Sequence, residues 1–197
     1  MAHLQVSLTV RSWNEAFDDS GFCAHPYTRS VLEEGLAANT NNNVLSPTYN
    51  PALLARCSAL SSDISFLLGI PDDNASWKTH RFHQTLISSP SPAFQAYILR
   101  LTHLIEKDPR KLLAHSYIRY MGDLNGGQIM KWNIRKAYGL GSNDRGTTFY
   151  DYGVMGSEGQ GDPAAPAAKM GDVKRIKEWF KNGIDVGVGN DMKLKGE

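Results

Sequence analysis

The sequence has few cysteines, no excess of charge of either sign and no long apolar run. It contains two cysteines, Cys23 and Cys57, and no cysteine or histidine spacing indicates a zinc site. Lysine and arginine total 21 against 20 acidic residues. The net charge of +1 therefore gives no overall positive potential that would attract nucleic acid. No stretch approaches the roughly 18 apolar residues of a transmembrane helix. Charged residues interrupt the N-terminal segment, which argues against a secretory signal. We expect a cytoplasmic protein without a membrane segment.

The rest of the composition is typical of a folded globular protein. Hydrophobic residues make up 41% of the 197 residues and charged residues 21%. A chain of this length buries roughly two thirds of its unfolded surface without disulfide bonds. We therefore predict a single domain over residues 1–197.

Apolar residues recur at helical spacing along most of the chain. The predicted helices cover residues 51–69, 91–105, 109–139 and 171–186. The segments predicted as loops or loose ends are residues 39–50, 141–170 and 187–197. Residues 1–28 have a weak pattern that fits either a strand or an unstructured start. Together these patterns predict an all-α fold, a helical bundle of irregular topology.

Three glycines lie in the middle of the long helix predicted over residues 109–139. Each of Gly122, Gly126 and Gly127 costs about 1 kcal/mol relative to alanine in a helix interior. The sum is a sizeable share of a net stability of about 5–15 kcal/mol. Gly122 and Gly126 are four residues apart and leave one face of the helix bare. Either a second helix packs there at short distance, or a flat ligand lies on the backbone and the glycines permit a kink. Asp123 between them is either solvated or poised at a polar pocket.

The ten residues Arg119-Tyr-Met-Gly-Asp-Leu-Asn-Gly-Gly-Gln128 resemble the signature of the distal helix in the haem oxygenases almost position for position. Leu32-Glu33-Glu34, the segment 46–51, the helix 51–69 and the segment 174–181 also resemble their counterparts in that family. The resemblance covers about residues 30–190, and the stretch 183–189 looks fungal. It implies a haem-oxygenase-like bundle with a glycine-kinked distal helix.

The resemblance implies a haem-degrading monooxygenase. Such an enzyme cleaves haem to biliverdin, carbon monoxide and ferrous iron, and haem is both substrate and cofactor. It uses O2 and electrons from an NADPH-dependent donor of the NADPH-cytochrome P450 reductase type. The expected partners are haem, O2 and that reductase. We expect a monomer that binds no nucleic acid, cytoplasmic or peripheral to the endoplasmic reticulum.

Roles on the distal helix follow from the same resemblance. Gly122 and Gly126, with Gly127 beside them, would let the backbone approach the porphyrin. Asp123 would hold a distal water network that donates a proton during oxygen activation. Arg119, one turn earlier, would steady that network.

The resemblance also indicates which residues meet the haem propionates. Tyr117 is placed to hydrogen-bond one propionate. Lys177 and Lys181 are one helical turn apart, so both ammonium groups can point at the two propionates. A solvated basic face, which contributes little to stability, is the alternative for the two lysines.

The axial iron ligand is not assigned by the sequence, and the metal-binding residue is left unknown. Residues 1–29 do not resemble the family, and the family position of the proximal histidine falls before Met1. His25 precedes Pro26, which favours a helix break there. His80 and His83 are spaced to chelate a metal on a helix but have no third ligand nearby, and His115 on the distal helix fits a packed side chain.

Two other hypotheses stay open beside the enzyme. The chain, which ends before the family's last helix, is expected to be truncated at both ends. It would then be a catalytically impaired haem-binding homologue that lacks the proximal histidine. Alternatively, it is a structural helical protein whose glycines serve only helix packing.

Overall fold

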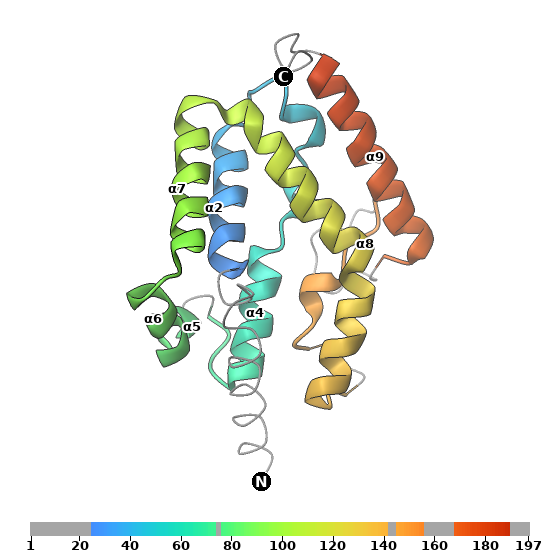
Figure 1. Cartoon of the computed structure of the whole chain (residues 1–197). Coiled ribbons are helices and arrows are strands. Elements are labelled where there is room, and N and C mark those ends of the chain that lie inside the picture. The colour runs from blue at the N-terminus through green and yellow to red at the C-terminus, as the bar shows by residue number, and fades with distance from the viewer. Residues whose placement is uncertain (1–24, 74–75, 142–144, 156–167, 190–197) are drawn as a thin grey trace. The chain divides into compact units, whose positions relative to one another are not determined.

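The computed structural model describes residues 25–73, 76–141, 145–155 and 168–189. Within these ranges all regular secondary structure is helical, which confirms the predicted all-α class (Figure 1). The α-helices are α2 (His25–Ala38), α3 (Pro51–Leu54), α4 (Cys57–Leu68), α5 (Ser76–Thr79), α6 (Arg81–Ser88), α7 (Pro92–Lys107), α8 (Leu112–Tyr138) and α9 (Met170–Gly189). The short 3₁₀ helices are η1 (Ser46–Thr48), η2 (Pro109–Lys111) and η3 (Thr148–Tyr150).

The chain forms two compact units. The first contains the described parts of residues 1–30, 56–98 and 129–149, and the second those of residues 31–55, 99–128 and 150–197. Helices α2, α7 and α8 each contribute residues to both units.

Polar side chains of α4 organise the first unit. Asp63 is 5% exposed and accepts hydrogen bonds from the backbone N–H of Thr148 at 2.9 Å and of Phe149 at 2.7 Å. The Thr148 hydroxyl donates a third bond to the same carboxylate at 2.8 Å. Two residues earlier, Ser61 Oγ accepts the indole N–H of Trp77. These bonds hold η3 and α5 against α4 and satisfy polar groups that burial would otherwise penalise.

The second unit has an apolar core drawn from five helices and the loop before η1. Its fully buried members, each less than 2% exposed, are Leu32, Val44, Leu45, Leu53, Leu54, Leu101, Leu112, Ile176 and Phe180. Each such side chain contributes about 1.5–3 kcal/mol relative to exposure. Leu112 begins α8 and Ile176 and Phe180 lie on α9, so the core fixes both helices that carry candidate site residues.

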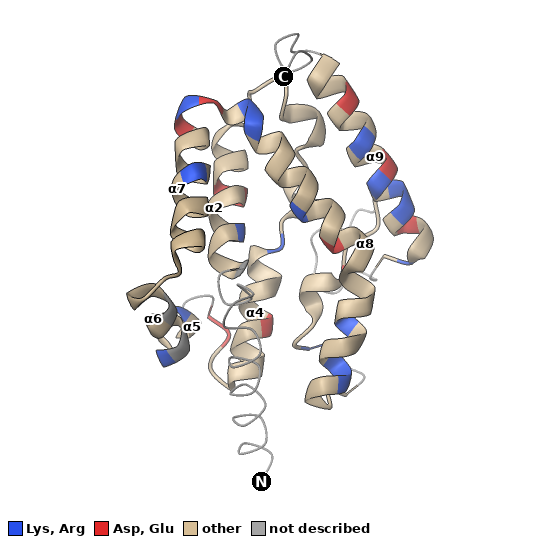
Figure 2. Ribbon diagram, in the orientation of Figure 1, with Lys and Arg blue, Asp and Glu red and all other residues tan. Residues whose placement is uncertain are grey.

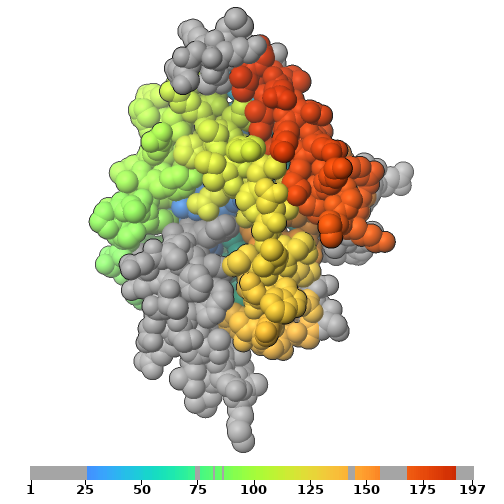
Figure 3. Space-filling view, turned by 45° about the vertical axis from the view of Figure 1, so that its right-hand side comes forward, coloured from blue at the N-terminus to red at the C-terminus, as the bar shows by residue number. Residues whose placement is uncertain are grey.

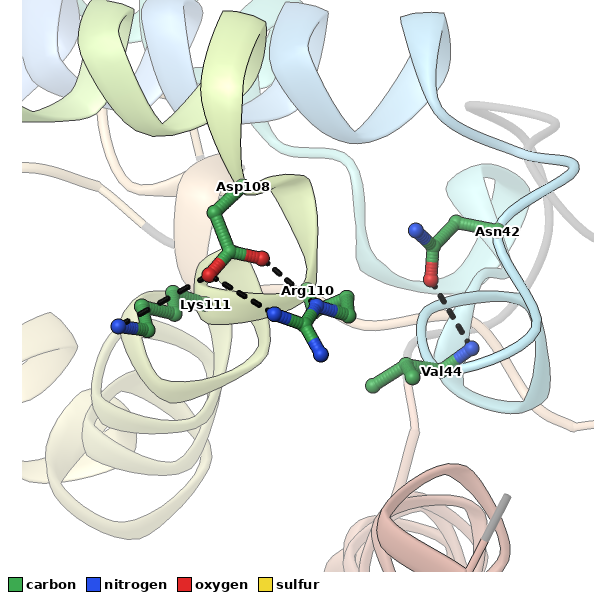
Figure 4. A network of polar contacts seen from close by, with 5 residues as sticks. All are labelled: Asn42, Val44, Asp108, Arg110 and Lys111. Atoms are coloured by element: carbon green, nitrogen blue, oxygen red, sulfur yellow. Dashed lines mark hydrogen bonds and ion pairs between the residues drawn. The ribbon is translucent and has the colours of Figure 1, made fainter. Parts of the chain in front are cut away.

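Local polar contacts shape the turns of the second unit (Figure 4). Between α7 and α8, Asp108 receives Arg110 Nε at 2.7 Å and Nη2 at 3.1 Å, and Lys111 Nζ lies 3.8 Å from its Oδ2. In the loop before η1, Asn42 Oδ1 accepts the backbone N–H of Val44 at 3.0 Å, a side-chain turn typical of asparagine. Both contacts are local in sequence and stabilise the turn in which they lie.

Helix α9 packs against η1 and the loop before it, and two glycines of α9 make the contact. A Cβ built at Gly183 would lie 2.5 Å from the carbonyl oxygen of Pro47. A Cβ at Gly187 would overlap the carbonyl oxygen of Val44. Because neither glycine has a side chain, the α9 backbone approaches the loop backbone directly. This contact sets the position of α9 along the loop.

Several expected boundaries were wrong by a few residues. The helix predicted over residues 51–69 is two helices, because Ala55 adopts an extended conformation with φ −68° and ψ 127°. Residues 25–28, assigned to the weak N-terminal pattern, form the first turn of α2, where Pro26 is tolerated. Helix α9 extends to Gly189, beyond the predicted end at 186. Residues 190–197 and most of the N-terminal segment lie outside the described residues.

Side chains and glycines at the helix ends cap several of the helices. Asn50 Oδ1 accepts the N–H of Leu53 at 3.1 Å at the start of α3. Gly69 and Gly139 end α4 and α8 in the left-handed region, with φ of 67° and 60°. No described helix is both long enough and apolar enough to cross a membrane.

Candidate functional site

Helix α8 presents an open strip of backbone at Gly122 and Gly126. A Cβ built at either position meets no atom within 4 Å beyond the helix itself, so in the described part of the chain nothing packs on the pair. Gly122 is exposed and Gly126 half-buried. Figure 3 shows α8 in yellow reaching the surface beside the orange and red α9. Of the two sequence interpretations, close packing of a described helix is absent at these glycines, and the open strip leaves room for a flat ligand.

Gly127 serves a different purpose from its neighbour. It is buried, and a Cβ there would lie 2.9 Å from Cδ1 of Tyr150. The next residue, Gln128, donates from Nε2 to the carbonyl oxygen of Tyr150 at 3.0 Å. Because Gly127 has no side chain, Tyr150 can pack against the side of α8 that faces away from the open strip.

Arg119 and Asp123 lie on one flank of the strip. Arg119 is three residues before Gly122 and Asp123 directly follows it, so helix geometry places them about 60° and 100° around from Gly122 in the same direction. Both are half-buried. The structure thus brings together the two residues expected to act on the distal side.

His115 is one turn before Arg119. Burial lowers the pKa of this imidazole below its usual 6.5, and the positive charges of Arg100 and Arg119 lower it further. A histidine with a lowered pKa is neutral near pH 7. This agrees with the interpretation of His115 as a packed side chain.

Asn125 lies on the other flank of the strip, and Tyr117 lies on the face of α8 that points away from it. Asn125 is three residues after Gly122 and Tyr117 five residues before it, about 60° and 140° around the helix on the side opposite Asp123. Tyr117 is 43% exposed. The flank that carries Asn125 faces α9, because Lys177 Nζ donates a hydrogen bond to Asn125 Oδ1 at 3.0 Å.

Helix α9 carries the two lysines expected to meet propionates. It is held to α8 by an edge-to-face contact of Tyr120 with Phe180, with ring centroids 5.8 Å apart. Lys177 is half-buried at the α8 side, whereas Lys181 is exposed one turn later. The two lysines therefore differ in their surroundings, although they share one face of the helix.

The remaining charges of α9 pair along the helix itself. Figure 2 shows basic and acidic residues interspersed on this helix. Lys174 Nζ lies 3.8 Å from Glu178 Oε1, and Arg175 pairs with Asp172. Hydrogen bonds from Arg175 and from the backbone of Lys169 lower the pKa of Asp172. These pairs are exposed and surround the lysines with a mixed rather than a purely positive surface.

The described histidines do not form a metal site. His80 lies between α5 and α6 rather than on a helix with His83, so the two histidines do not share the helix on which their spacing would allow chelation. His83 Nδ1 is 2.7 Å from the Lys78 carbonyl oxygen, and its ring packs edge-to-face on Trp77. His25 is the first residue of α2. Within the described ranges, no group of three or more metal-binding side chains comes together.

Two residues of the site had no role in the sequence interpretation. Asn125 was within the glycine signature, and its place three residues after Gly122 is the signal that puts it beside the strip. Tyr150 lies in the segment predicted as a loop, where only the structure reveals its contact with Gly127.

The chain belongs to the haem oxygenase family. The family model described as "Heme oxygenase" matches residues 19–162. Among curated proteins, "Heme oxygenase 1" of Pongo abelii is 36% identical over 122 residues, which cover 62% of this chain and 38% of that protein. "Heme oxygenase" of Porphyra purpurea is 36% identical over 126 residues, covering 64% of this chain and 48% of that protein. The chain spans less than half the length of these relatives.

Solved structures of the family share the fold. The haem oxygenase of Leptospira interrogans is 30% identical, with a TM-score of 0.54 over 85% of this chain and 78% of that chain. Heme oxygenase-2 from Synechocystis, solved in complex with heme and NO, is 26% identical, with a TM-score of 0.55 over 84% of this chain and 66% of that chain.

Proposed function

We propose that this chain binds haem on the open strip of α8 and cleaves it oxidatively to biliverdin, carbon monoxide and ferrous iron. The observation that carries the proposal is the strip itself. In a member of the haem oxygenase family, Gly122 and Gly126 leave a stretch of helix backbone on which nothing described packs. A flat macrocycle fits such a surface, because it can approach the backbone without meeting a side chain.

The charges beside the strip also suit this ligand. Haem combines an apolar ring with two carboxylate groups at one edge. Lys177 of α9 supplies a cation on one flank of α8, and Lys181 supplies a second cation one turn later on α9. Charge-assisted bonds from lysine to a carboxylate are stronger than neutral ones. The macrocycle would thus lie with its carboxylate edge toward α9.

The opposite flank holds the groups for proton transfer. Haem supplies the iron and the oxidisable ring when it is bound, and the protein supplies orientation and electrostatics. The Asp123 carboxylate would accept hydrogen bonds from water through its Oδ atoms and hold that water where it can donate a proton toward the strip. The Arg119 guanidinium, one turn away on the same helix, would help to orient that water.

The bare backbone also limits what reaches the reacting centre. A side chain at Gly122 or Gly126 would occupy the space over the strip, where O2 must fit between the helix and the ring. Glycine keeps that space open, and a ring bound over the strip would itself exclude bulk water from the backbone beneath it. Exclusion of water strengthens the electrostatic effect of Asp123 and Arg119.

The electrons would come from an NADPH-dependent reductase of the NADPH-cytochrome P450 reductase type. Membership of the haem oxygenase family supports this donor. We further propose that the chain acts as a monomer in the cytoplasm. The low cysteine content suits a reducing compartment.

The test is a haemin titration followed by turnover. The protein is titrated with haemin, then given NADPH and a cytochrome P450 reductase in air while absorption spectra are recorded. We expect the Soret band to sharpen on binding and then decay as a biliverdin band grows. Carbon monoxide is measured in parallel by its binding to ferrous myoglobin. Haem binding without ring opening would contradict the cleavage activity, and no binding would contradict the whole proposal.

Asp123→Ala separates binding from catalysis. The variant should bind haemin as the wild type does but form biliverdin at least about tenfold more slowly, because a positioned proton donor contributes about 10²–10⁴ in rate. Asp185→Ala is the control, since Asp185 is an exposed carboxylate on α9 outside the site. Wild-type rates in Asp123→Ala would exclude its proton-transfer role.

A further inference from the structure

Lys177 is held across the gap between two helices by a single side chain. Its Nζ donates to Oδ1 of Asn125 at 3.0 Å, and the two residues are 52 positions apart in the sequence. Asn125 directly precedes Gly126, so the bond ends at the edge of the open strip. The other described cations with contacts on α9, Lys174 and Arg175, pair within their own helix instead.

This bond restricts a side chain that is otherwise among the most mobile. Fixing a lysine costs up to about 2 kcal/mol of rotamer entropy. An ammonium group has three N–H donors, and one directed at Asn125 leaves two for another acceptor. Part of the entropy of ordering Lys177 is therefore already lost before a ligand arrives, which favours binding by preorganisation.

We propose that Asn125 is a positioning residue for carboxylate recognition. Its Oδ1 holds the Lys177 ammonium beside the strip, with two N–H groups directed at a carboxylate on the edge of a flat ligand. The inference rests on the proposed function, since that ligand is haem and the carboxylate is a propionate. Asn125 suits this task because its amide is neutral and adds no negative charge to repel the propionate.

A purely structural role would give a different pattern. If the Asn125–Lys177 bond only tied α9 to α8, its loss would weaken binding of any flat ligand on the strip. If it orients Lys177 for a carboxylate, its loss matters only for ligands that carry one. Haemin and haemin dimethyl ester share the same ring and iron, and the ester lacks the two negative charges.

The experiment compares these two ligands across a set of variants. Dissociation constants are measured by Soret titration for wild type, Asn125→Ala, Lys177→Ala and the double variant. We expect Asn125→Ala to weaken haemin binding by about fivefold, in the range of exposed charge-assisted contacts, and to leave ester binding unchanged. The double variant should bind haemin no more weakly than Lys177→Ala, because Asn125 acts through Lys177.

Two matched controls account for helix and charge effects. Asn133→Ala removes an exposed asparagine from the same helix, and Lys174→Ala removes an exposed lysine one turn before Lys177. Neither should change the ratio of haemin to ester affinity. Thermal unfolding of each variant without ligand should give an unchanged midpoint, since the bond lies at the surface.

The outcomes separate this inference from the proposed function. If wild type binds haemin and Asn125→Ala binds both ligands as wild type does, or weakens both equally, the positioning role is overturned while the proposed function stands. Additive losses in the double variant would also overturn it. If wild type binds neither ligand, the proposed function fails and the inference fails with it.

Discussion

The backbone N–H of Phe149 donates to Oδ2 of Asp63 at 2.7 Å, and this bond anchors the segment that follows α8 to a buried carboxylate. Two further bonds from Thr148 complete the coordination of that carboxylate. A buried charge is tolerated when hydrogen bonds replace its lost hydration. The side chain of one α4 residue thus determines where a chain segment some 85 residues later begins its turn.

Replacing Asp63 should strongly destabilise the first unit. In Asp63→Leu the two N–H groups and the Thr148 hydroxyl lose their acceptor, and we expect a loss of about 3 kcal/mol in the free energy of unfolding. Urea unfolding followed by circular dichroism measures it. The control Asp185→Asn, at an exposed site, should stay within about 0.5 kcal/mol of wild type. A similar value for Asp63→Leu would show that the carboxylate does not anchor η3.

Alanine at Gly126 should make the protein more stable and less active. The new methyl group meets no described atom within 4 Å, so the helix gains about 1 kcal/mol from the better helix former. The same methyl group would stand between the backbone and the haem ring, and we expect cleavage to slow by at least about tenfold. Unfolding curves and biliverdin formation measure the two effects. Reduced stability, or unchanged turnover, would argue against an open strip that receives the ring.

Alanine at Gly187 should have the opposite effect on stability. Its methyl group would overlap the carbonyl oxygen of Val44, which is backbone and cannot rotate away. We expect a loss of about 2 kcal/mol, typical of overpacking. Gly171→Ala, on the same helix with open space around it, is the matched control and should be neutral or slightly stabilising. Equal thermal midpoints for the two variants would refute the backbone contact of α9.

His115 should make stability depend on pH in the acidic range. Its pKa is lowered in the folded protein by burial, Arg100 and Arg119, so between that value and 6.5 the unfolded chain binds more protons. Stability from this residue is complete above 6.5 and declines as the pH falls through this window. Urea unfolding at about pH 5 and about pH 7.5 should show a smaller difference in His115→Gln than in wild type. His103→Gln, at an exposed position of α7, is the control; an equal difference in both variants would contradict the assignment.

Apolar periodicity predicted the helical segments of α3, α4, α7, α8 and α9, but not α2, α5 or α6. The end of α8 at Gly139 and the start of α3 at Asn50 are set by local chemistry, which a sequence displays directly. The break at Ala55 was missed because Leu54 and Cys57 keep helical spacing on either side of it. One extended residue between two helices leaves the helical spacing of the apolar residues almost unchanged, so the sequence pattern does not reveal it.

Some features of the candidate site were likewise predicted from the sequence, and others are visible only in the structure. The glycine signature placed Gly122, Gly126 and Asp123 on one helix from the sequence alone. The sequence put Gly126 on the same face as Gly122, but it did not show the role of Gly127, because that role depends on a contact with Tyr150, more than twenty residues away. The sequence also did not predict the bond from Lys177 to Asn125, because that bond depends on how α9 packs beside α8, 52 residues away in the sequence.

The two glycines of α9 also act as a register lock. Gly183 meets the carbonyl of Pro47 and Gly187 that of Val44, and the two glycines are one turn apart. A slip of α9 by one turn in one direction would bring the indole of Trp179 onto the Pro47 carbonyl, where only a hydrogen atom fits. The same slip would carry Lys177 about 6 Å along the helix axis, away from Asn125. The position of Lys177 along the α9 axis, and so its distance from Asn125, is thus set by two residues that have no side chains.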